Sequence, residues 1–273
     1  MKAEKEGYDI VTSVFFALTF VGLTLIVFPQ IVVLLTSFNS TPELAFPPKG
    51  LSLKWYRHMI EREAFFHSVK LSLLLATLAT VASLVISFLF SLAVVRHKFF
   101  GRDLINALIL SPLIIPEVVS GLALLYIFNR LQLYNTTVNL LILHILLTLP
   151  YSVRVISATL YRFDVSLEEA ALSLGADRLR TFALITVPLI RPGLISAAVF
   201  SFVVSFNNFT ATMFIVTRQT TLPVEVFSYI RTENDPTVAA ISSVFVILTI
   251  LLILVNRKRI GARDLSGDRT ARK

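Results

Sequence analysis

The sequence predicts an all-α membrane protein with six transmembrane helices. The 273 residues are 55% hydrophobic, with a mean hydropathy of +0.78, and only 15% are charged. Soluble domains carry about 25% charged residues. The apolar residues also fall into runs that are too long for the helices or strands of a soluble core. Inside a bilayer each run must satisfy its own backbone hydrogen bonds, which favours helices.

Six runs without charged residues predict the individual spans. The first lies between Asp9 and Glu43, and its apolar part at 10–35 is longer than the core of a signal peptide, so a membrane helix is expected there. Each of the other runs also has about 20 residues or more, enough to cross a bilayer. These runs are 71–95, 104–128 (interrupted only by Glu117), 131–153, 192–217 and 236–256.

The distribution of Lys and Arg predicts the orientation. If the N-terminus is cytoplasmic, 16 of the 25 Lys and Arg residues lie on cytoplasmic segments and 7 on outer segments. Cytoplasmic loops of membrane proteins carry such an excess, so both termini are expected inside. The same distribution accounts for the net charge of +8 without a nucleic-acid partner.

The cytoplasmic loop between the fourth and fifth spans contains a helix-turn-helix pattern. Ser166 and Glu169 have capping-box spacing, and Gly175 is a natural helix stop at positive φ. Asp177 is suited to cap a second helix over 178–187, ended by Pro188. The first helix either docks in a groove of another protein or lies on the membrane surface. Its apolar side chains share one narrow face: Leu167, Ala170, Ala171 and Leu174.

Part of this loop resembles the EAA motif of ABC importer permeases. The match is Glu169-Ala170-Ala171, three residues, Gly175, nine residues, then Ile185-Thr186-Val187-Pro188, with Val187 in place of the family's Leu. The resemblance implies a five-helix type I permease core at 65–256, with an EAA loop at about 161–190. It also implies that the transmembrane helix and outer loop at 1–64 are an N-terminal addition, while the Lys and Arg residues at 257–273 predict a basic cytoplasmic tail.

By the same resemblance, residues 166–175 form a cytoplasmic coupling helix that sits in a cleft of an ATP-hydrolysing subunit. The ATPase-coupling residues would be Glu169, Ala170, Ala171, Gly175 and Pro188. The implied partners are an ATP-binding subunit dimer, a second, non-identical permease subunit, and a periplasmic or extracellular solute-binding protein. The implied location is the bacterial cytoplasmic (inner) membrane.

Looser matches are similar to the spermidine/putrescine-type branch of these permeases. They lie at 112–121, at 205–209 and at 221–224 followed by Tyr229. The branch also imports other small organic solutes, so the resemblance implies a polyamine-like or an amino-acid-like or opine-like solute. Polyamine members carry acidic residues where this chain has Asn207 and Asn208. This difference weakens the case for a polycation.

Glu117 is the deepest charged residue of the predicted spans. It lies about 13 residues into the third span, or ~20 Å along a straight helix. A carboxylate at this depth is costly unless it faces water, a partner or a ligand. Pro112 and Pro116 would loosen the helix beside it, as in many transport pathways. The alternatives are a residue of the substrate pathway or a hydrogen-bonded carboxyl group that joins two helices.

Asn207 and Asn208 are expected at a similar depth. They lie about 15 residues into the fifth span, or ~23 Å along a straight helix. Two adjacent amides cannot both face lipid, so at least one should point into the bundle. They either belong to the substrate pathway or form an interhelical hydrogen bond.

Motifs for enzymatic chemistry are missing from the sequence. The four histidines are dispersed, so a metal site is not expected. No cofactor is expected either. No Gly is followed by Lys, which excludes a Walker A loop, so this chain is not expected to hydrolyse ATP. A secondary transporter or channel that is not coupled to ATP remains an alternative. A membrane-embedded enzyme would need clustered His, Asp or Glu.

Overall fold

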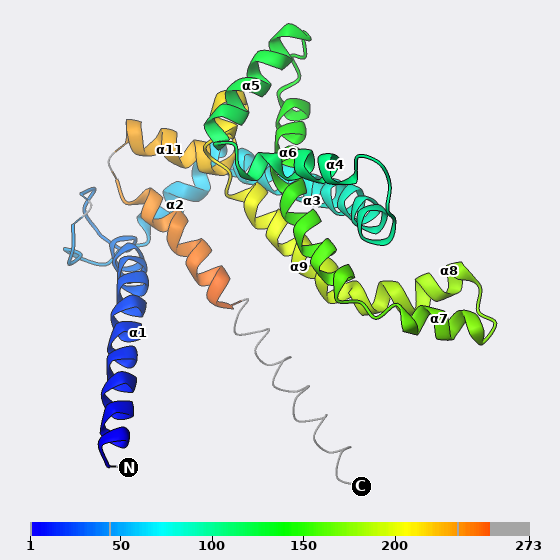
Figure 1. Cartoon of the computed structure of the whole chain (residues 1–273). Helices are drawn as coiled ribbons and strands as arrows, with labels where there is room; N and C mark the ends of the chain where they lie inside the picture. The colour runs from blue at the N-terminus through cyan, green and yellow to red at the C-terminus, as the bar shows by residue number, and fades with distance from the viewer. Residues whose placement is uncertain (1, 44, 234, 252–273) are drawn as a thin grey trace. The chain divides into compact units, whose positions relative to one another are not determined.

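The computed structural model describes residues 2–43, 45–233 and 235–251 (Figure 1). These residues form helices joined by turns, with one isolated bridge between Asn39 and Leu51, so the predicted all-α class is confirmed. The described residues divide into two compact units, one within 2–63 and 228–251 and one over 64–227. The predicted basic tail at 257–273 lies outside the described residues.

The first unit is held together by hydrogen bonds around the ends of its helices. The Tyr56 hydroxyl lies 2.7 Å from the hydroxyls of both Ser37 and Ser243. The Trp55 indole N–H donates to the Asn39 carbonyl at 2.7 Å, which fixes the loop before α2. The helices of this unit are α1 (Lys2–Thr36), α2 (Lys54–Glu61), the end of α11 (Leu222–Thr232) and a helix over Thr237–Leu251.

The second unit is a bundle in which α6 and α9 lie side by side (Figure 1). One hydrophobic cluster joins Leu75 of α3, Phe128 of α5 and Leu143 of α6. The helices and turns of this unit are α3 (Glu63–Arg96), α4 (Arg102–Leu110), η1 (Ser111–Leu113), α5 (Glu117–Arg130), α6 (Thr136–Tyr161), α7 (Ser166–Ser173), α8 (Arg178–Thr181), the π-helical turn η2 (Phe182–Thr186), α9 (Val187–Phe206), α10 (Thr212–Ile215) and the start of α11.

Small and hydroxylated residues line the helix contacts of the second unit. The Ser83 hydroxyl of α3 lies 2.6 Å from the Thr148 hydroxyl of α6. Ser152 of α6 and Ser201 of α9 are in similar contact at 2.6 Å. Such residues let helices approach closely in a membrane, where polar groups need partners inside the bundle. A spacing of three or four residues places the buried small residues of α3 on one face. They are Ser68, Ser72, Ala76, Ala79, Ser83, Ser87 and Ser91.

Replacing Gly193 with alanine is expected to lower the melting temperature of the purified protein. A Cβ at this position of α9 would collide with the Thr159 side chain of α6. Overpacking of this kind costs about 1–3 kcal/mol. Gly22→Ala in α1 is the matched control, because no described heavy atom lies within 4 Å of its added Cβ. Thermal unfolding in detergent measures both variants, and an unchanged melting temperature for Gly193→Ala would contradict the close helix contact.

The number of spans is only partly as predicted. Among the described residues, four helices are long and apolar enough to cross a membrane, and the α4–η1 and α5 pair makes up to five. The predicted span 236–256 is a shorter apolar helix, Thr237–Leu251, up to the end of the described residues. A count of six spans is therefore not confirmed. The four long helices are Thr12–Thr36, Glu63–Arg96, Thr136–Tyr161 and Arg178–Phe206.

The third predicted span is wrong as a continuous helix. The chain bends by 105° between Arg102–Leu113 and Glu117–Arg130. Pro116 is the extended residue before α5, where proline has no N–H to continue a helix. The depth calculated for Glu117 along a straight helix therefore does not apply.

The predicted break at Pro188 is also wrong. A helix continues from Arg178 through Pro188 to Phe206, because Pro188 lies in the first turn of α9, after the π-helical turn η2. The fifth span thus begins earlier than predicted and ends at Phe206. Asn207 is the residue that caps this end, so Asn207 and Asn208 follow the helix and do not lie inside it.

Candidate functional site

Helix α7 ends in the turn that the sequence predicts. Gly175 has φ +88°, and its N–H donates to the Leu172 carbonyl at 3.0 Å. The N–H of Ala176 donates to the Ala171 carbonyl at 3.1 Å, which completes a Schellman motif. Asp177 then caps α8, its carboxylate accepting the Arg180 N–H at 2.8 Å. Both local predictions are confirmed.

The start of α7 differs from the predicted capping box. Val165 occupies the N-cap position, and the Asp164 carboxylate accepts the N–H of Ser166 at 3.0 Å. Hydrogen bonds from the side chain and backbone of Ser166 lower the pKa of Asp164. In the predicted capping box, the Glu169 side chain would accept the backbone N–H of Ser166. Asp164 accepts this N–H instead, so Glu169 has no capping role.

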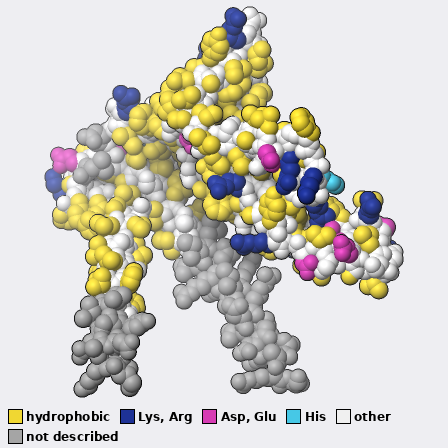
Figure 2. Space-filling model, in the orientation of Figure 1, with side chains coloured by type: hydrophobic (Ala, Val, Ile, Leu, Met, Phe, Trp, Pro, Cys, Tyr) yellow, Lys and Arg dark blue, Asp and Glu magenta, His cyan; other side chains and the backbone are white. Residues whose placement is uncertain are grey.

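The residues of the EAA motif present an exposed surface. Glu169, Ala170 and Pro188 are exposed, and Ala171 is half-buried. Leu174, on the predicted apolar face, is 89% exposed. Figure 2 shows Lys, Arg, Asp and Glu side chains gathered over the α7–α8 end of the second unit, with hydrophobic side chains over much of the rest of its visible face. An exposed apolar helix with an acidic residue beside it is suited to bind another protein.

Glu168, which precedes the motif, turns inward. The Arg96 guanidinium donates two hydrogen bonds to its carboxylate, at 2.8 and 2.7 Å, and the Thr186 hydroxyl donates a third. Burial acts to raise the pKa of Glu168, but the hydrogen bonds from Arg96 and Thr186 and the charge of Arg96 outweigh it and lower the pKa. No sequence pattern singled out Glu168, because Arg96 is 72 residues away.

The structure brings Glu117 and Asn208 together. Glu117 is the first residue of α5, where the helix dipole favours a negative charge. Its carboxylate accepts the Asn208 side-chain N–H at 3.0 Å. The Asn208 side-chain oxygen accepts from the backbone N–H and the hydroxyl of Thr212, at 3.2 and 2.8 Å. Asn208 is only 6% exposed, whereas Glu117 and Asn207 are exposed.

A close approach of two backbone segments makes this pairing possible. A Cβ at Gly121, in the first turns of α5, would lie 2.8 Å from the Ala211 carbonyl oxygen. Only glycine lets α5 rest directly on the turn after α9. The expectation that one of the two amides points into the bundle is therefore confirmed for Asn208.

A buried histidine extends this polar network. His144 of α6 lies 3.2 Å from the Thr212 hydroxyl through Nε2 and 2.7 Å from the Ser205 hydroxyl through Nδ1. The network thus runs from Glu117 through Asn208, Thr212 and His144 to Ser205. From the sequence alone, His144 is one of the four dispersed histidines, which were considered only as metal ligands. The position of His144 inside an apolar run could have predicted a buried polar contact, because ionisable residues within membrane spans are usually paired with other polar groups.

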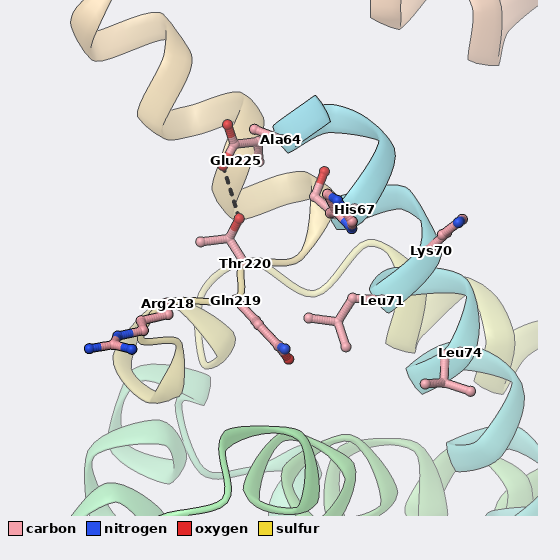
Figure 3. Close-up of a pocket in the computed structure, with 10 residues that line it drawn as sticks. Ala64, His67, Lys70, Leu71, Leu74, Arg218, Gln219, Thr220 and Glu225 are labelled. Atoms are coloured by element: carbon pink, nitrogen blue, oxygen red, sulfur yellow. Dashed lines mark hydrogen bonds between the residues drawn. The ribbon is translucent and has the colours of Figure 1, made fainter. Parts of the chain in front are cut away.

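A cavity of about 470 Å³ opens between the start of α3 and the segment before α11 (Figure 3). The Lys70 ammonium lies 4.1 Å from the centre of the Phe66 ring, and Figure 3 shows Lys70 and Arg218 extending away from each other. The Glu225 carboxylate accepts the Thr220 hydroxyl at 2.9 Å. The charged side chains of this cavity do not converge on one point, so Glu117 remains the better candidate for solute contact.

Comparison with known proteins gives a consistent group of relatives. Residues 83–258 match the family described as binding-protein-dependent transport system inner membrane component. The chain is 31% identical over 230 residues to the putrescine transport system permease protein PotI of Escherichia coli K12, covering 81% of this chain and 82% of PotI. It is 27% identical over 246 residues to the spermidine/putrescine transport system permease protein PotC of Haemophilus influenzae, covering 88% and 94%.

Similarity extends to a transporter of known structure. The match is to a crystal structure of a bacterial ABC transporter involved in the import of the acidic polysaccharide alginate. The TM-score is 0.70 with 17% identity, over 91% of this chain and 96% of the other. At this identity the likeness concerns the fold, and it agrees with the helical permease architecture.

Proposed function

Because the chain belongs to the family of binding-protein-dependent transport system inner membrane components, we propose that α7 docks on the ATP-binding subunit of its importer. The protein is a permease subunit of an ABC importer and a multi-pass protein of the inner membrane. Such an importer also has an ATP-binding subunit, a second permease subunit and a solute-binding protein. In this proposal the second permease is a different chain and the ATP-binding subunits form a dimer.

The exposure of α7 supports the docking role. The helix presents Leu174 and Glu169 outward, and Leu179 just beyond the turn is 81% exposed. The Schellman turn at Gly175 holds the direction of this short helix. A helix that lies on lipid typically carries Lys and Arg on its polar face, whereas the charged residues of α7 are Glu168 and Glu169.

Docking alone does not drive transport, so the two states of the importer must differ in affinity for ATP. A ligand that binds both states equally shifts no population. In the proposed cycle, ATP draws two ATP-binding subunits together, and the docked coupling helices move with them. The permease pair then opens toward the solute-binding protein, and hydrolysis restores the inward-facing state.

The arrangement at the end of α9 supports a translocation site made of Glu117, Asn207 and Asn208. Asn208 uses its side-chain donor on Glu117 and its acceptor on Thr212, so its role would be to hold the carboxylate in place. The exposed carboxylate of Glu117 and the exposed amide of Asn207 would contact solute. Glu117 directly follows the 105° bend between η1 and α5, and broken helices form the solute sites of many transporters, which supports this proposal.

The proposed solute is a small organic molecule with a cationic nitrogen. Glu117 would accept a charge-assisted hydrogen bond from an ammonium group. The relatives PotI and PotC are named for putrescine and spermidine transport. The exposed neutral amide of Asn207 leaves room for a solute that also carries a carboxylate, such as an amino acid or opine.

Reconstitution tests the coupling proposal. The permease pair, the ATP-binding subunits and the solute-binding protein are placed in proteoliposomes, with putrescine and octopine as probes. We expect ATP hydrolysis that the loaded solute-binding protein stimulates, together with uptake that depends on ATP. Uptake that followed an ion gradient and ignored ATP would contradict the coupling role of α7.

The proposed orientation can be tested by thiol labelling, because the chain contains no cysteine. Ser173→Cys in α7 is expected to react with an impermeant maleimide only after the cells are opened. Thr232→Cys, at the end of α11, should react in spheroplasts whose inner membrane is intact. Labelling of Ser173→Cys in intact spheroplasts would reverse the proposed topology.

A further inference from the structure

We propose that Glu168 is a positioning residue for coupling: together with Arg96 and Thr186 it fastens α7 to the ends of α3 and α9. Movement of the docked helix would then reach both transmembrane helices. The proposal rests on the docking role of α7 proposed above. The proposed role of Glu168 depends on contacts inside this subunit, whereas the proposed role of the EAA residues is to contact the ATP-binding subunit.

Helix α7 buries no side chain of its own against the bundle. None of its eight residues, all of which the structure describes, is buried. A helix of this length is not stable alone in water. Apolar packing therefore contributes little to the position of α7, and a polar contact can decide it.

The contact between Arg96 and Glu168 has the geometry of a strong ion pair. Two parallel N–H···O bonds of 2.8 and 2.7 Å join the planar guanidinium to the carboxylate. The side chains are only 28% and 13% exposed, so solvent screens the pair less than a surface pair. The Arg96 guanidinium also lies 5.6 Å from the centre of the Phe163 ring, next to the start of the loop.

Thr186 connects the same carboxylate to the base of α9. Its side chain is fully buried at the end of the π-helical turn η2, and its hydroxyl donates to Glu168. One carboxylate thus links three elements that are far apart in the sequence. These elements are α3 through Arg96, α7 through Glu168 itself, and the η2–α9 junction through Thr186.

The helices fastened in this way move with the bundle core. Phe88 of α3 packs against a cluster that includes Ile156 of α6 and Ile190 of α9. The Phe88 ring also lies 5.9 Å from the Phe182 ring of η2. Packed interiors transmit displacement because they have few voids. A pull on α7 through Glu168 would therefore act on α3 and α9 together.

Two neighbouring acids of α7 have different surroundings. Glu168 is bound to its own subunit, whereas Glu169 is exposed. Successive residues of a helix point about 100° apart, so one turn can face both the bundle and a partner. The pair of acids would join the ATP-binding subunit on one side to the permease core on the other.

A distance measurement tests the fastening without ATP or solute. Spin labels are attached at Ser173→Cys and His97→Cys in the assembled complex, and their distance distribution is measured by pulsed electron paramagnetic resonance. We expect Glu168→Gln to broaden this distribution, and the charge swap of Arg96→Glu with Glu168→Arg to narrow it again. Glu61→Gln is the matched control, because it removes an exposed ion pair with Arg57. An unchanged distribution for Glu168→Gln would overturn the proposal.

A transport measurement tests the consequence. In proteoliposomes with putrescine as the probe, we expect Glu168→Gln to lower uptake per ATP hydrolysed by at least about fivefold. The ATP-binding subunit should still co-purify, because the outward face of α7 is intact, and the charge swap should recover coupling. If Glu168→Gln kept the wild-type uptake per ATP hydrolysed, the proposed role of Glu168 would be overturned, but the proposed function of the subunit would not. A wild-type complex without ATP-dependent transport of either putrescine or octopine would instead contradict the proposed function, while the distance measurement still decides the role of Glu168.

Discussion

Replacing Gly175 with valine is expected to lower solute-stimulated ATP hydrolysis by at least about tenfold, which corresponds to ~1.4 kcal/mol. Gly175 has φ +88°, a region that a β-branched residue avoids. Helix α7 would leave its Schellman turn and change direction. In the proposed docking, Leu174 and Glu169 would then no longer face the ATP-binding subunit together.

The rest of the subunit should remain folded in this variant. No described heavy atom lies within 4 Å of a Cβ at Gly175, so the cost is confined to the backbone, at about 1–2 kcal/mol. Gly101→Val is a matched control, because Gly101 has φ +81° and equally open surroundings before α4. Both variants are compared for thermal stability, ATPase stimulation and co-purification of the ATP-binding subunit. Normal stimulation by Gly175→Val would contradict the proposed role of α7.

Replacing Glu117 with glutamine is expected to lower uptake of the transported solute by about tenfold or more, with little change in stability. A charge-assisted hydrogen bond to an ammonium group contributes about 1.5–3 kcal/mol, and glutamine removes the charge. The glutamine side-chain oxygen can still accept from Asn208, so the contact between α5 and the turn after α9 should survive. Glu117→Ala removes both interactions and should also lower the melting temperature.

The structural alternative for Glu117 predicts a different pattern. If the carboxylate only joins α5 to Asn208, Glu117→Gln should transport normally, and only Glu117→Ala should be affected. Uptake of putrescine and octopine, measured beside thermal stability, separates the two accounts. Glu225→Gln is the control, because Glu225 is a half-buried acid that accepts a hydrogen bond from Thr220 within its own subunit. It should leave uptake unchanged.

The local features of the coupling loop could be predicted from the sequence because they depend on neighbouring residues. The positive φ at Gly175 follows from the absence of a Cβ, and the cap at Asp177 needs only the backbone N–H of Arg180. The helical class likewise follows from apolar runs that must satisfy their own backbone in a bilayer. The EAA spacing also identified the family before any contact was known.

Contacts between distant residues were decided by the tertiary structure. The 105° bend before α5 and the end of α9 at Phe206 moved Glu117 and Asn208 from their predicted positions within straight helices. These two residues are 91 positions apart, and Arg96 and Glu168 are 72 positions apart. A sequence pattern reports which residues share a helix face. It does not report which side chain of another helix lies opposite, because that depends on helix packing and on where glycine permits a close approach, as Gly121 does at Ala211.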